Sequence, residues 1–406
     1  ATHTITDAST NGNNLDVSIT ATDAAGNITI TDFNDSIHID TVVPTIAINS
    51  TASSTLNAEQ TATITFTLSE ASEDFTQEDV VVDGGTLSNF MVTETDTVYT
   101  ATFTPDANRS TPATISVSSN KFSDAAGNLN ADGSESNNSL SLTVDTVLPV
   151  VTDGNITVTG GTGTGGAFVA GDTLEVTWNN TTEGDNNGDI NSVTVNLSDF
   201  GGNATQTLTN NGNGSWSATY LVTTLSTNGS NLNVSVTATD TAGNSTSVTD
   251  TSNIVIDTVG PVVTADNITV TGDSGPGGAF VEGDTLTVTW NNTGYGDNYD
   301  MLNDGQVASV TVDLSAFGGS ATQALTNNYG SWSATYTVTN ARVQALNISL
   351  TVTDGVGNAT TALSATSVSA NPPVLSYDGD FTEAAANDGS VEGSRVITLT
   401  GDTFAT

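Results

Sequence analysis

The residues best suited to chemistry recur in one short pattern, an aspartate followed four residues later by the asparagine of a Gly-Asn pair. The four copies occupy residues 23–27, 124–128, 240–244 and 354–358, each after a stretch rich in Val and Thr. Gly and Asn both tolerate positive φ, so the pair predicts a turn. A hairpin explains the glycine but leaves the repeated aspartate unexplained, and aspartate is the usual carboxylate of calcium loops. This turn motif therefore indicates a turn that also offers oxygen ligands.

A second group of oxygen-rich side chains lies between the turn motifs. Asp185, Asn187 and Asp189 alternate along the chain like the first ligands of a calcium loop. An EF-hand would place a bidentate Glu at loop position twelve, where this chain has Asn196, so the segment is not an EF-hand. For this segment and its later counterpart, cation binding and an ordinary polar loop are the two alternative interpretations. The counterpart spaces its carboxylates differently: Asp297, Asp300 and Asp304.

The charge of the chain is strongly one-sided, with 45 acidic against 4 basic residues and a formal net charge of −41 at pH 7. Such a surface repels nucleic acid and anionic membranes, so neither is expected as a partner. No apolar run approaches the roughly 20 residues of a membrane-spanning helix. Asp supplies most of the charge, which favours cation-binding loops; halophilic adaptation or Asp-rich turns would explain it without a cation. The acidic segment 69–85 predicts mainly a solvated strand edge, with a cation site as the alternative.

Few side chains of the chain are suited to catalysis. There is no cysteine, and the 2 histidines are His3 and His38, which excludes disulfides, thiolate metal sites and a repeated zinc site. A Ser-His-Asp triad would need one of these histidines, and no two carboxylates stand out as a glycosidase pair. The glycine-rich segments 160–166 and 272–278 lack a following lysine and helix, so we predict flexible loops rather than phosphate sites. We predict that the protein is not an enzyme.

Apolar and polar residues alternate along many short stretches. Leu174, Val176 and Trp178 share one face of such a stretch, and Trp216 and Ala218 share a face of another. About seven such strands in roughly 100 residues, without helical periodicity, predict an antiparallel β-sandwich of the immunoglobulin type. The predicted fold class is all-β, with tandem immunoglobulin-like (Ig-like) antiparallel sandwiches in an extended array and the tryptophans in their cores.

Internal repeats divide the chain into modules. Residues 155–180 match 267–292, and residues 11–27 match 228–244. The opening residues resemble the middle of a module, so we expect the chain to be part of a longer protein. The predicted division is 1–43, the C-terminal half of an Ig-like module; 44–148, an Ig-like module of a second type; 149–260, an Ig-like module; 261–371, a repeat of that module; and 372–406, the start of a further module.

Three of the turn motifs are followed, after a further strand, by an Asp-Thr-Val-x-Pro exit segment. This combination resembles the bacterial Ig-like repeats of giant surface adhesins, including those exported with RTX-type signals, and the resemblance covers nearly all of residues 1–371. In that family, tandem sandwiches bind calcium at or near the module junctions, which stiffens a long stalk. The resemblance implies these calcium ligands: Asp23, Asn27 and Asp40; Asp124, Asn128 and Asp145; and Asp240, Asn244 and Asp257.

Two details qualify this ligand set. Asp153 and Asp266 lie just inside the following modules and are candidates to complete the junction sites. In the last repeat Asp354 and Asn358 are present, but Val-Ser-Ala-Asn-Pro-Pro replaces the exit segment, so no junction aspartate follows. Chain geometry alone does not bring the turn of a module to its own exit aspartate, because a strand run separates them and a bulge or bend would be needed.

The function implied by the resemblance is structural. We expect a stalk or extender segment of a large secreted or cell-surface bacterial adhesin of the kind found in biofilms, stiffened by calcium ions between neighbouring modules of one long chain. The alternative is a subunit of an extracellular filament or surface layer, in which Ig-like modules contact other copies of the chain. A glycan-binding module is a third class, for which the sequence offers no distinctive site.

Overall fold

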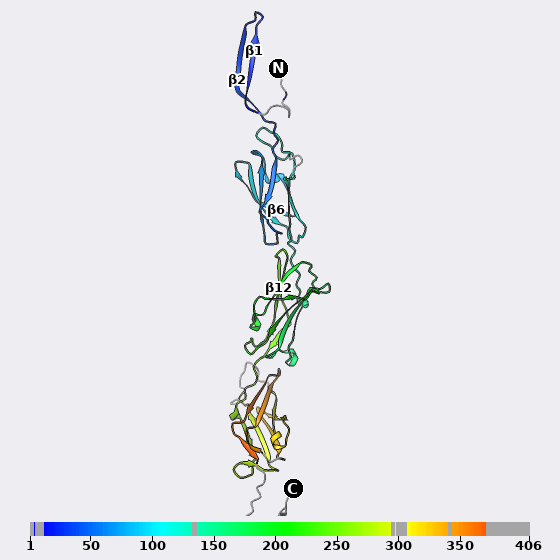
Figure 1. The fold of residues 1–406 in the computed structure, drawn as a ribbon, viewed down its shortest axis with the longest axis vertical. Coiled ribbons are helices and arrows are strands. Elements are labelled where there is room, and N and C mark those ends of the chain that lie inside the picture. Colours follow the sequence, from blue (N-terminus) through cyan, green and yellow to red (C-terminus); the bar gives the residue numbers. More distant parts are fainter. Residues whose placement is uncertain are drawn as a thin grey trace, which may run out of the picture. The chain divides into compact units, whose positions relative to one another are not determined.

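The computed structural model describes Thr4, residues 12–131, 136–293, Asp297, 307–339 and 343–370. Within these residues thirty β-strands alternate with six short 3₁₀ helices, which confirms the predicted all-β fold (Figure 1). The chain divides into two compact units, one made of Ala1–Gly260 with Thr353–Ala359 and the other of Pro261–Val352 with the residues after Ala359. None of the described helices is long and apolar enough to cross a membrane. The predicted module start at 372–406 lies outside the described residues.

The first described element is a hairpin of β1 (Gly12–Thr22) and β2 (Ile28–Ile39), joined by the first turn motif. Its sequence matches β16 and β17 of a later module, where Val236 is fully buried. In the hairpin the equivalent Ile19 is 54% exposed. Ile28 and Ile30 of β2 are exposed as well, so the hairpin carries exposed apolar side chains among the described residues.

Residues 44–148 form a sandwich of a four-stranded and a three-stranded antiparallel sheet. The four-stranded sheet has the order β3 (Ile46–Ser50), β4 (Ala62–Leu68), β7 (Val98–Pro105) and β6 (Gly85–Glu94). The other sheet has the order β5 (Val80–Asp83), β8 (Ala113–Val117) and β9 (Ser139–Leu142), with helix η1 (Gln77–Asp79) before β5. One core lies between the sheets, and Phe75 contacts four other aromatic rings there.

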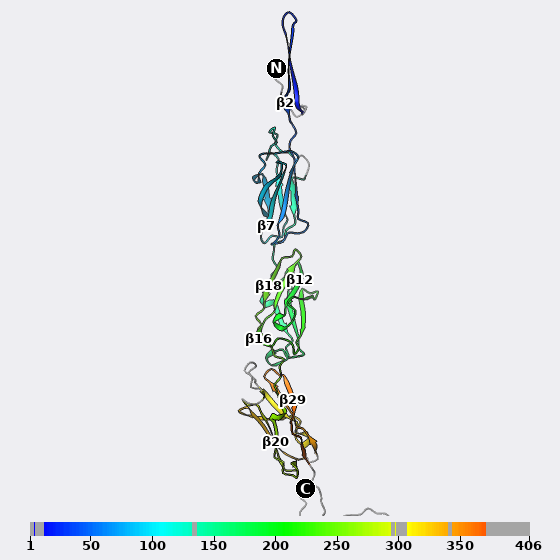
Figure 2. The same ribbon diagram turned by 90° about the vertical axis from the view of Figure 1, so that its left-hand side faces the viewer.

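Residues 149–260 form two four-stranded sheets and a two-stranded one (Figure 2). The first sheet has the order β10 (Ile156–Thr159), β11 (Thr173–Asn179), β15 (Ser215–Leu221) and β14 (Thr209–Asn210). The second has the order β13 (Gln206–Thr207), β12 (Ile190–Asn196), β17 (Ser235–Asp240) and β18 (Ser245–Thr249). The smaller sheet pairs β16 (Gly229–Leu232) with β19 (Ile254–Ile256). The short helices are η2 (Asp153–Asn155), η3 (Thr164–Gly166) and η4 (Ser198–Phe200).

Residues 261–370 repeat this arrangement. The first sheet has the order β20 (Ile268–Thr271), β22 (Thr285–Asn291), β26 (Ser331–Thr337) and β25 (Thr326–Asn328). The second has the order β24 (Gln323–Ala324), β23 (Val307–Val312), β28 (Ser349–Asp354) and β29 (Ala359–Leu363). A third sheet has the order β21 (Ala279–Phe280), β30 (Val368–Ala370) and β27 (Val343–Leu346). Helices η5 (Ala265–Asn267) and η6 (Ser315–Phe317) complete the described elements.

The core of each module is separate, and each is built from the alternating residues of its strands. Along β11 the burial pattern places Leu174, Val176 and Trp178 on the inner face, as the period of two predicts. Trp178 pairs with Trp216 across β11 and β15, and both are at most 8% exposed. Their counterparts Trp290 and Trp332 are equally buried, so the four tryptophans are core residues, as expected.

Each of the two glycine-rich loops, predicted to be flexible, is hydrogen-bonded to an aspartate. Asp172 accepts hydrogen bonds from the N–H and Oγ1 of Thr162 at 3.0 and 2.6 Å, and from the N–H of Val169 at 2.9 Å. Burial would raise the pKa of Asp172, but these hydrogen bonds outweigh it and keep that pKa below its ordinary value. Asp284 holds the second loop in the same way through Ser274 and Val281.

We expect Gly160→Ala to destabilise this module far more than Gly165→Ala in the same loop. A Cβ at Gly160 would lie 2.0 Å from the carbonyl oxygen of Thr173, at a φ of +115°, whereas Gly165 has φ +70° and open space around it. The free energy of unfolding should fall by roughly 2 kcal/mol or more for the first change and by about 1 kcal/mol for the second. Urea unfolding followed by tryptophan fluorescence measures both, and equal losses would contradict the close approach.

Candidate cation sites between successive modules

The turn motifs share one internal hydrogen-bond pattern, which their aspartate builds. Asp240 Oδ1 accepts the N–H groups of Ala242 and Asn244, each at 2.9 Å, and Asp240 Oδ2 accepts Asn244 Nδ2 at 2.8 Å. Gly243 closes the turn at φ +95°. The aspartate thus satisfies the backbone donors of its turn, a local role that the sequence analysis did not assign. The same bonds form at Asp23, Asp124 and Asp354.

The exit aspartates Asp40, Asp145 and Asp257 each hold a tight turn, in which Oδ1 accepts the N–H of the residue two positions later at 3.0 to 3.2 Å. Their carbonyl oxygens accept a side-chain N–H from a turn motif that lies later in the chain. The donors and distances are Asn128 Nδ2 to Asp40 at 3.2 Å, Asn244 Nδ2 to Asp145 at 2.9 Å, and Asn358 Nδ2 to Asp257 at 3.1 Å. All of these residues belong to the first compact unit.

This pairing corrects the expected ligand sets, which grouped each turn motif with the exit aspartate of its own module. The turn of a module meets the exit aspartate of the module before it, so Asp240 lies beside Asp145 rather than Asp257. The strands that follow the turn carry the chain to the opposite end of the sandwich before it exits. Asp354 and Asn358 therefore have an exit aspartate, Asp257, although none follows them in the sequence.

The structure brings three carboxylates together at two of these contacts. In each set, one carboxylate oxygen per residue lies within 4.8 Å of the others. Calcium binds oxygens at 2.3–2.6 Å, so two oxygens on opposite sides of one ion lie about 5 Å apart, and the spacing fits a shared cation. We name the sets the first cluster, Asp40, Glu70 and Asp124, and the second cluster, Asp145, Asp189 and Asp240.

The negative charges of these carboxylates repel one another. Burial, followed by the charges of Asp124 and Asp40, raises the pKa of Glu70. At the third contact burial, together with the charge of Asp354, raises the pKa of Asp257. Asp240 is 1% exposed, and none of the ion pairs of the described residues involves a member of either cluster. A buried charge without a cationic partner is costly, so a bound cation would remove a penalty.

Asp185 has a different role from the cation ligand considered for it. Its two oxygens accept four hydrogen bonds, from the N–H and Oγ1 of Thr152, from Asn155 Nδ2 and from the indole Nε1 of Trp178 at 2.7 Å. These bonds occupy its oxygens and tie the loop to the start of the module. Asp297 repeats the arrangement in the last module, accepting bonds from Thr264, Asn267 and Trp290.

The other residues predicted as cation ligands do not come together in one site. Asn187 Oδ1 accepts the N–H of Val150 at 2.7 Å, whereas Asp189 belongs to the second cluster. Asp153 accepts both the N–H and the Oγ1 of Thr251, at 3.0 and 2.7 Å, and so caps another loop. Asp266 is exposed in the second unit and belongs to neither cluster of the described residues. The remaining candidates, Asp300 and Asp304, lie outside the described residues.

The asparagines of the turn motifs donate hydrogen bonds through Nδ2, and their role as oxygen ligands stays a prediction. Asn128 Nδ2 faces two acceptors, Asp124 Oδ2 and the carbonyl of Asp40, which fixes the amide orientation. Asn27 makes only the internal bond to Asp23 among the hydrogen bonds assigned to its side chain, and its turn is exposed. Sequence analysis did not single out Glu70 within the acidic segment 69–85, since only the fold brings this side chain to Asp40 and Asp124.

We expect the indole signal of Trp178 to titrate with Asp185 at a midpoint below the ordinary aspartate value of 3.8. Burial would raise the pKa of Asp185, but the hydrogen bonds from Thr152, Trp178 and Asn155 outweigh it and lower the pKa. The folded state therefore binds this proton less readily than the unfolded chain, so the stabilisation is present above pH 3.8 and is lost as the pH falls below it.

NMR spectra of the indole N–H groups between pH 6 and pH 2.5 measure this titration. Asp185→Asn should remove it from the Trp178 signal and leave Trp290, which bonds Asp297, as the internal control. The variant should also lose roughly 2 kcal/mol of unfolding free energy at pH 7. An unchanged Trp178 titration would contradict the assigned hydrogen bond.

Comparison with known proteins identifies one module. Residues 40–144 match the family model described as a bacterial Ig-like domain. No curated protein matches the chain. Among solved structures, the chain is similar to the tetra-tandem repeat in the extending region of a large adhesion protein, with 19% identity, 88% of this chain and 82% of that chain covered, and a TM-score of 0.23.

Two animal proteins give comparable values. The FN1–FN3 domains of chicken CNTN1 match with 12% identity, cover 79% of this chain and 99% of their own, and have a TM-score of 0.26. The human desmocollin-1 ectodomain matches with 12% identity and a TM-score of 0.22, covering 85% of this chain and 62% of that one. With TM-scores this low, no property of these proteins is transferred to the chain. Residues 40–144 are similar to a bacterial Ig-like domain.

Proposed function

We propose that this chain is a structural segment of a secreted or cell-surface bacterial protein, in which tandem Ig-like modules are joined through calcium sites. The observation that carries the proposal is the repeated three-carboxylate cluster, formed each time by an exit aspartate, a turn-motif aspartate and one further acid. A cluster that recurs at successive contacts suits a joint between modules better than a catalytic centre, which would need one unique cleft.

The donor set supports calcium in particular. Calcium takes six to eight oxygen ligands and prefers carboxylates and carbonyls, which are the groups gathered here. In the second cluster Asp240 Oδ1 accepts backbone N–H groups and Oδ2 accepts Asn244 Nδ2. An Oδ2 lone pair not used by Asn244 and the carboxylate oxygens of Asp145 and Asp189 are the candidate ligands. Calcium at 100 times its dissociation constant would stabilise the bound state by about 2.7 kcal/mol per site.

In this proposal the segment acts as the stalk or extender of a large adhesin, whose adhesive part lies elsewhere in the protein. The bacterial Ig-like domain at residues 40–144 supports a bacterial surface setting. The strong negative charge is consistent with it, because a self-repelling chain gains cohesion when divalent cations bind at its joints. Export with an RTX-type signal and a place in biofilms belong to this proposal.

One observation favours a second candidate function, a filament or surface-layer subunit. Ile19 of the β1–β2 hairpin is 54% exposed, although the matching Val236 of β17 is fully buried. Exposed strands with an apolar face are templates for pairing with another chain. Other copies of the chain would then be its partners.

We expect calcium to raise the melting temperature of the chain, and two substitutions to weaken this effect. Glu70→Gln and Asp189→Asn each remove one carboxylate from a cluster without touching the turn motif. Because even indirect changes around a metal cost about 10- to 100-fold in affinity, loss of a carboxylate ligand should weaken its site by tenfold or more. Isothermal titration calorimetry and thermal unfolding, with and without EDTA, measure both effects.

Matched controls separate site chemistry from net charge. The control variants are Glu73→Gln and Glu183→Gln. Glu73 is close to Glu70 in the sequence and Glu183 is close to Asp189, and both are exposed and outside the clusters. These variants should bind calcium like the wild type. Equal losses in control and cluster variants, or a melting temperature indifferent to calcium, would refute the calcium sites.

Sedimentation distinguishes the two candidate functions. A stalk segment should remain monomeric with calcium across the micromolar range, whereas a filament subunit should sediment as large particles. If large particles form, Ile19→Asp should dissolve them, since a charge at this exposed position would oppose its burial against another copy of the chain. Particles that form equally with Ile19→Asp would exclude the hairpin as the contact.

A further inference from the structure

The second junction contains a contact that involves no carboxylate. The turn motif at residues 240–244 touches the loop 56–60 of the preceding module, which connects β3 to β4. The N–H of Ala58 donates to Asn244 Oδ1 at 2.9 Å, and Asn57 Nδ2 donates to the carbonyl of Ala242 at 3.2 Å. These are direct hydrogen bonds between protein groups.

The loop 56–60 is fixed by its own module before it meets the turn. Leu56 is 4% exposed, its N–H donates to Thr143, and its carbonyl accepts the N–H of Asp145 at 2.9 Å. Asn57 Oδ1 accepts the N–H of Glu59 at 3.0 Å, which points Nδ2 toward the turn motif. The donors Asn57 Nδ2 and Ala58 N–H therefore lie on a fixed loop, which is also hydrogen-bonded to the exit aspartate Asp145.

The side chain of Asn244 forms hydrogen bonds both to the preceding module and to its own turn. Its Oδ1 accepts Ala58 N–H, and its Nδ2 donates to the carbonyl of Asp145 and to Asp240 Oδ2. Asn244 is only 4% exposed, so these bonds are sheltered from water. A neutral amide thus bridges two modules with donors and acceptors matched on both sides.

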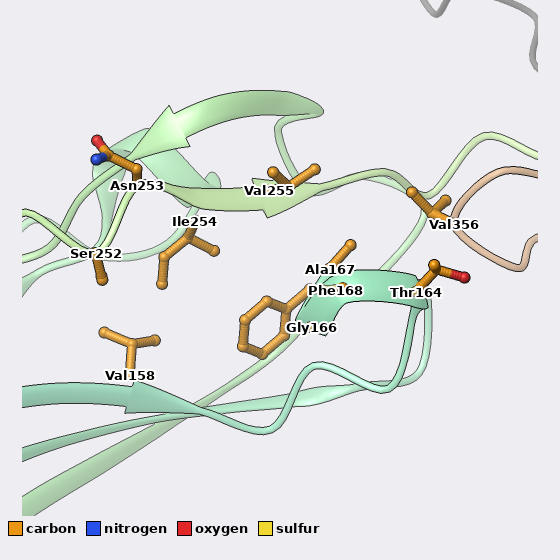
Figure 3. A pocket seen from close by; sticks show the side chains of 11 residues that line it. Val158, Thr164, Gly166, Ala167, Phe168, Ser252, Asn253, Ile254, Val255 and Val356 are labelled. Carbon is orange, nitrogen blue, oxygen red and sulfur yellow. The ribbon is translucent and has the colours of Figure 1, made fainter.

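A related bond occurs at the third contact with a different donor. Val356 occupies the position of Ala242 in its turn motif, and its carbonyl accepts the N–H of Thr164 at 2.9 Å. Figure 3 shows Val356 beside Thr164 at one end of the pocket lined by Val158, Phe168 and Ile254. A side chain donates at one contact and a backbone N–H at the other, but the accepting carbonyl is the same.

We propose that loop 56–60 and Asp145 form a binding surface, here called the socket, which recognises the turn motif of the next module by hydrogen bonds alone. Asn57 positions the turn motif on this surface. The inference goes beyond the proposed function, because each of these hydrogen bonds joins two protein groups and needs no cation as a bridge. Calcium would then add affinity to a contact whose geometry already exists. Removing calcium should lower the stability of this joint without opening it.

Amide hydrogen exchange of the full chain in EDTA tests the socket, since the N–H of Ala58 is itself one of the bonds. In the wild type this amide should exchange about tenfold more slowly than in Asn57→Ala, where the neighbouring bond is missing. The amide of Ile64 in the core reports whether the module stays folded. Asn49→Ala, an exposed asparagine of the same module outside the socket, should behave like the wild type.

Adding calcium separates the socket from the proposed function. If Ala58 exchanges in EDTA as fast in the wild type as in Asn57→Ala, and calcium slows both, the socket is refuted and the calcium joint stands. If Ala58 is slow in EDTA and calcium changes nothing, the socket stands and the calcium sites fail. Slow exchange in EDTA that calcium slows further would support both.

Discussion

The structure depends on one constraint, the burial of an aspartate at the tip of a turn where two modules meet. Asp240 organises its turn through hydrogen bonds from backbone N–H groups and from Asn244, and its carboxylate lies beside two others. Burying this charge costs free energy that the turn and the asparagine offset only in part. The uncompensated negative charge makes the joint both a weak point and a candidate cation site.

The many other aspartates serve a different purpose, which explains why acidity alone does not identify a site. Asp172 and Asp185 accept backbone and side-chain N–H and O–H groups in loops that have no regular partner strand. A sandwich of short strands leaves many such donors, and a carboxylate satisfies several at once. Their lowered pKa values distinguish these loop aspartates from Glu70 and Asp257, whose pKa values are raised.

Each module has its own core, and within the first compact unit the described contacts between residues 44–148 and 149–260 lie in loops outside these cores. The described contacts between residues 44–148 and 149–260 include Asn57, Ala58 and Asp145 with the turn motif that contains Asn244. These hydrogen bonds and the second carboxylate cluster lie outside the two cores. In the proposed function a cation bound at this cluster would strengthen the contact without a change in either core.

The sequence by itself determined the strands, the repeats and the residue types at the joints. Period-two patterns identified the inner faces of β11 and β15, because burial in a sandwich acts on alternate residues. Only the tertiary structure decided which aspartates meet. Asp240 joins Asp145 and Asp189, and Glu70 joins Asp124, because pairing across modules depends on which end of a sandwich each loop reaches. The number and direction of the strands determine which end a loop reaches, and the local sequence does not encode this.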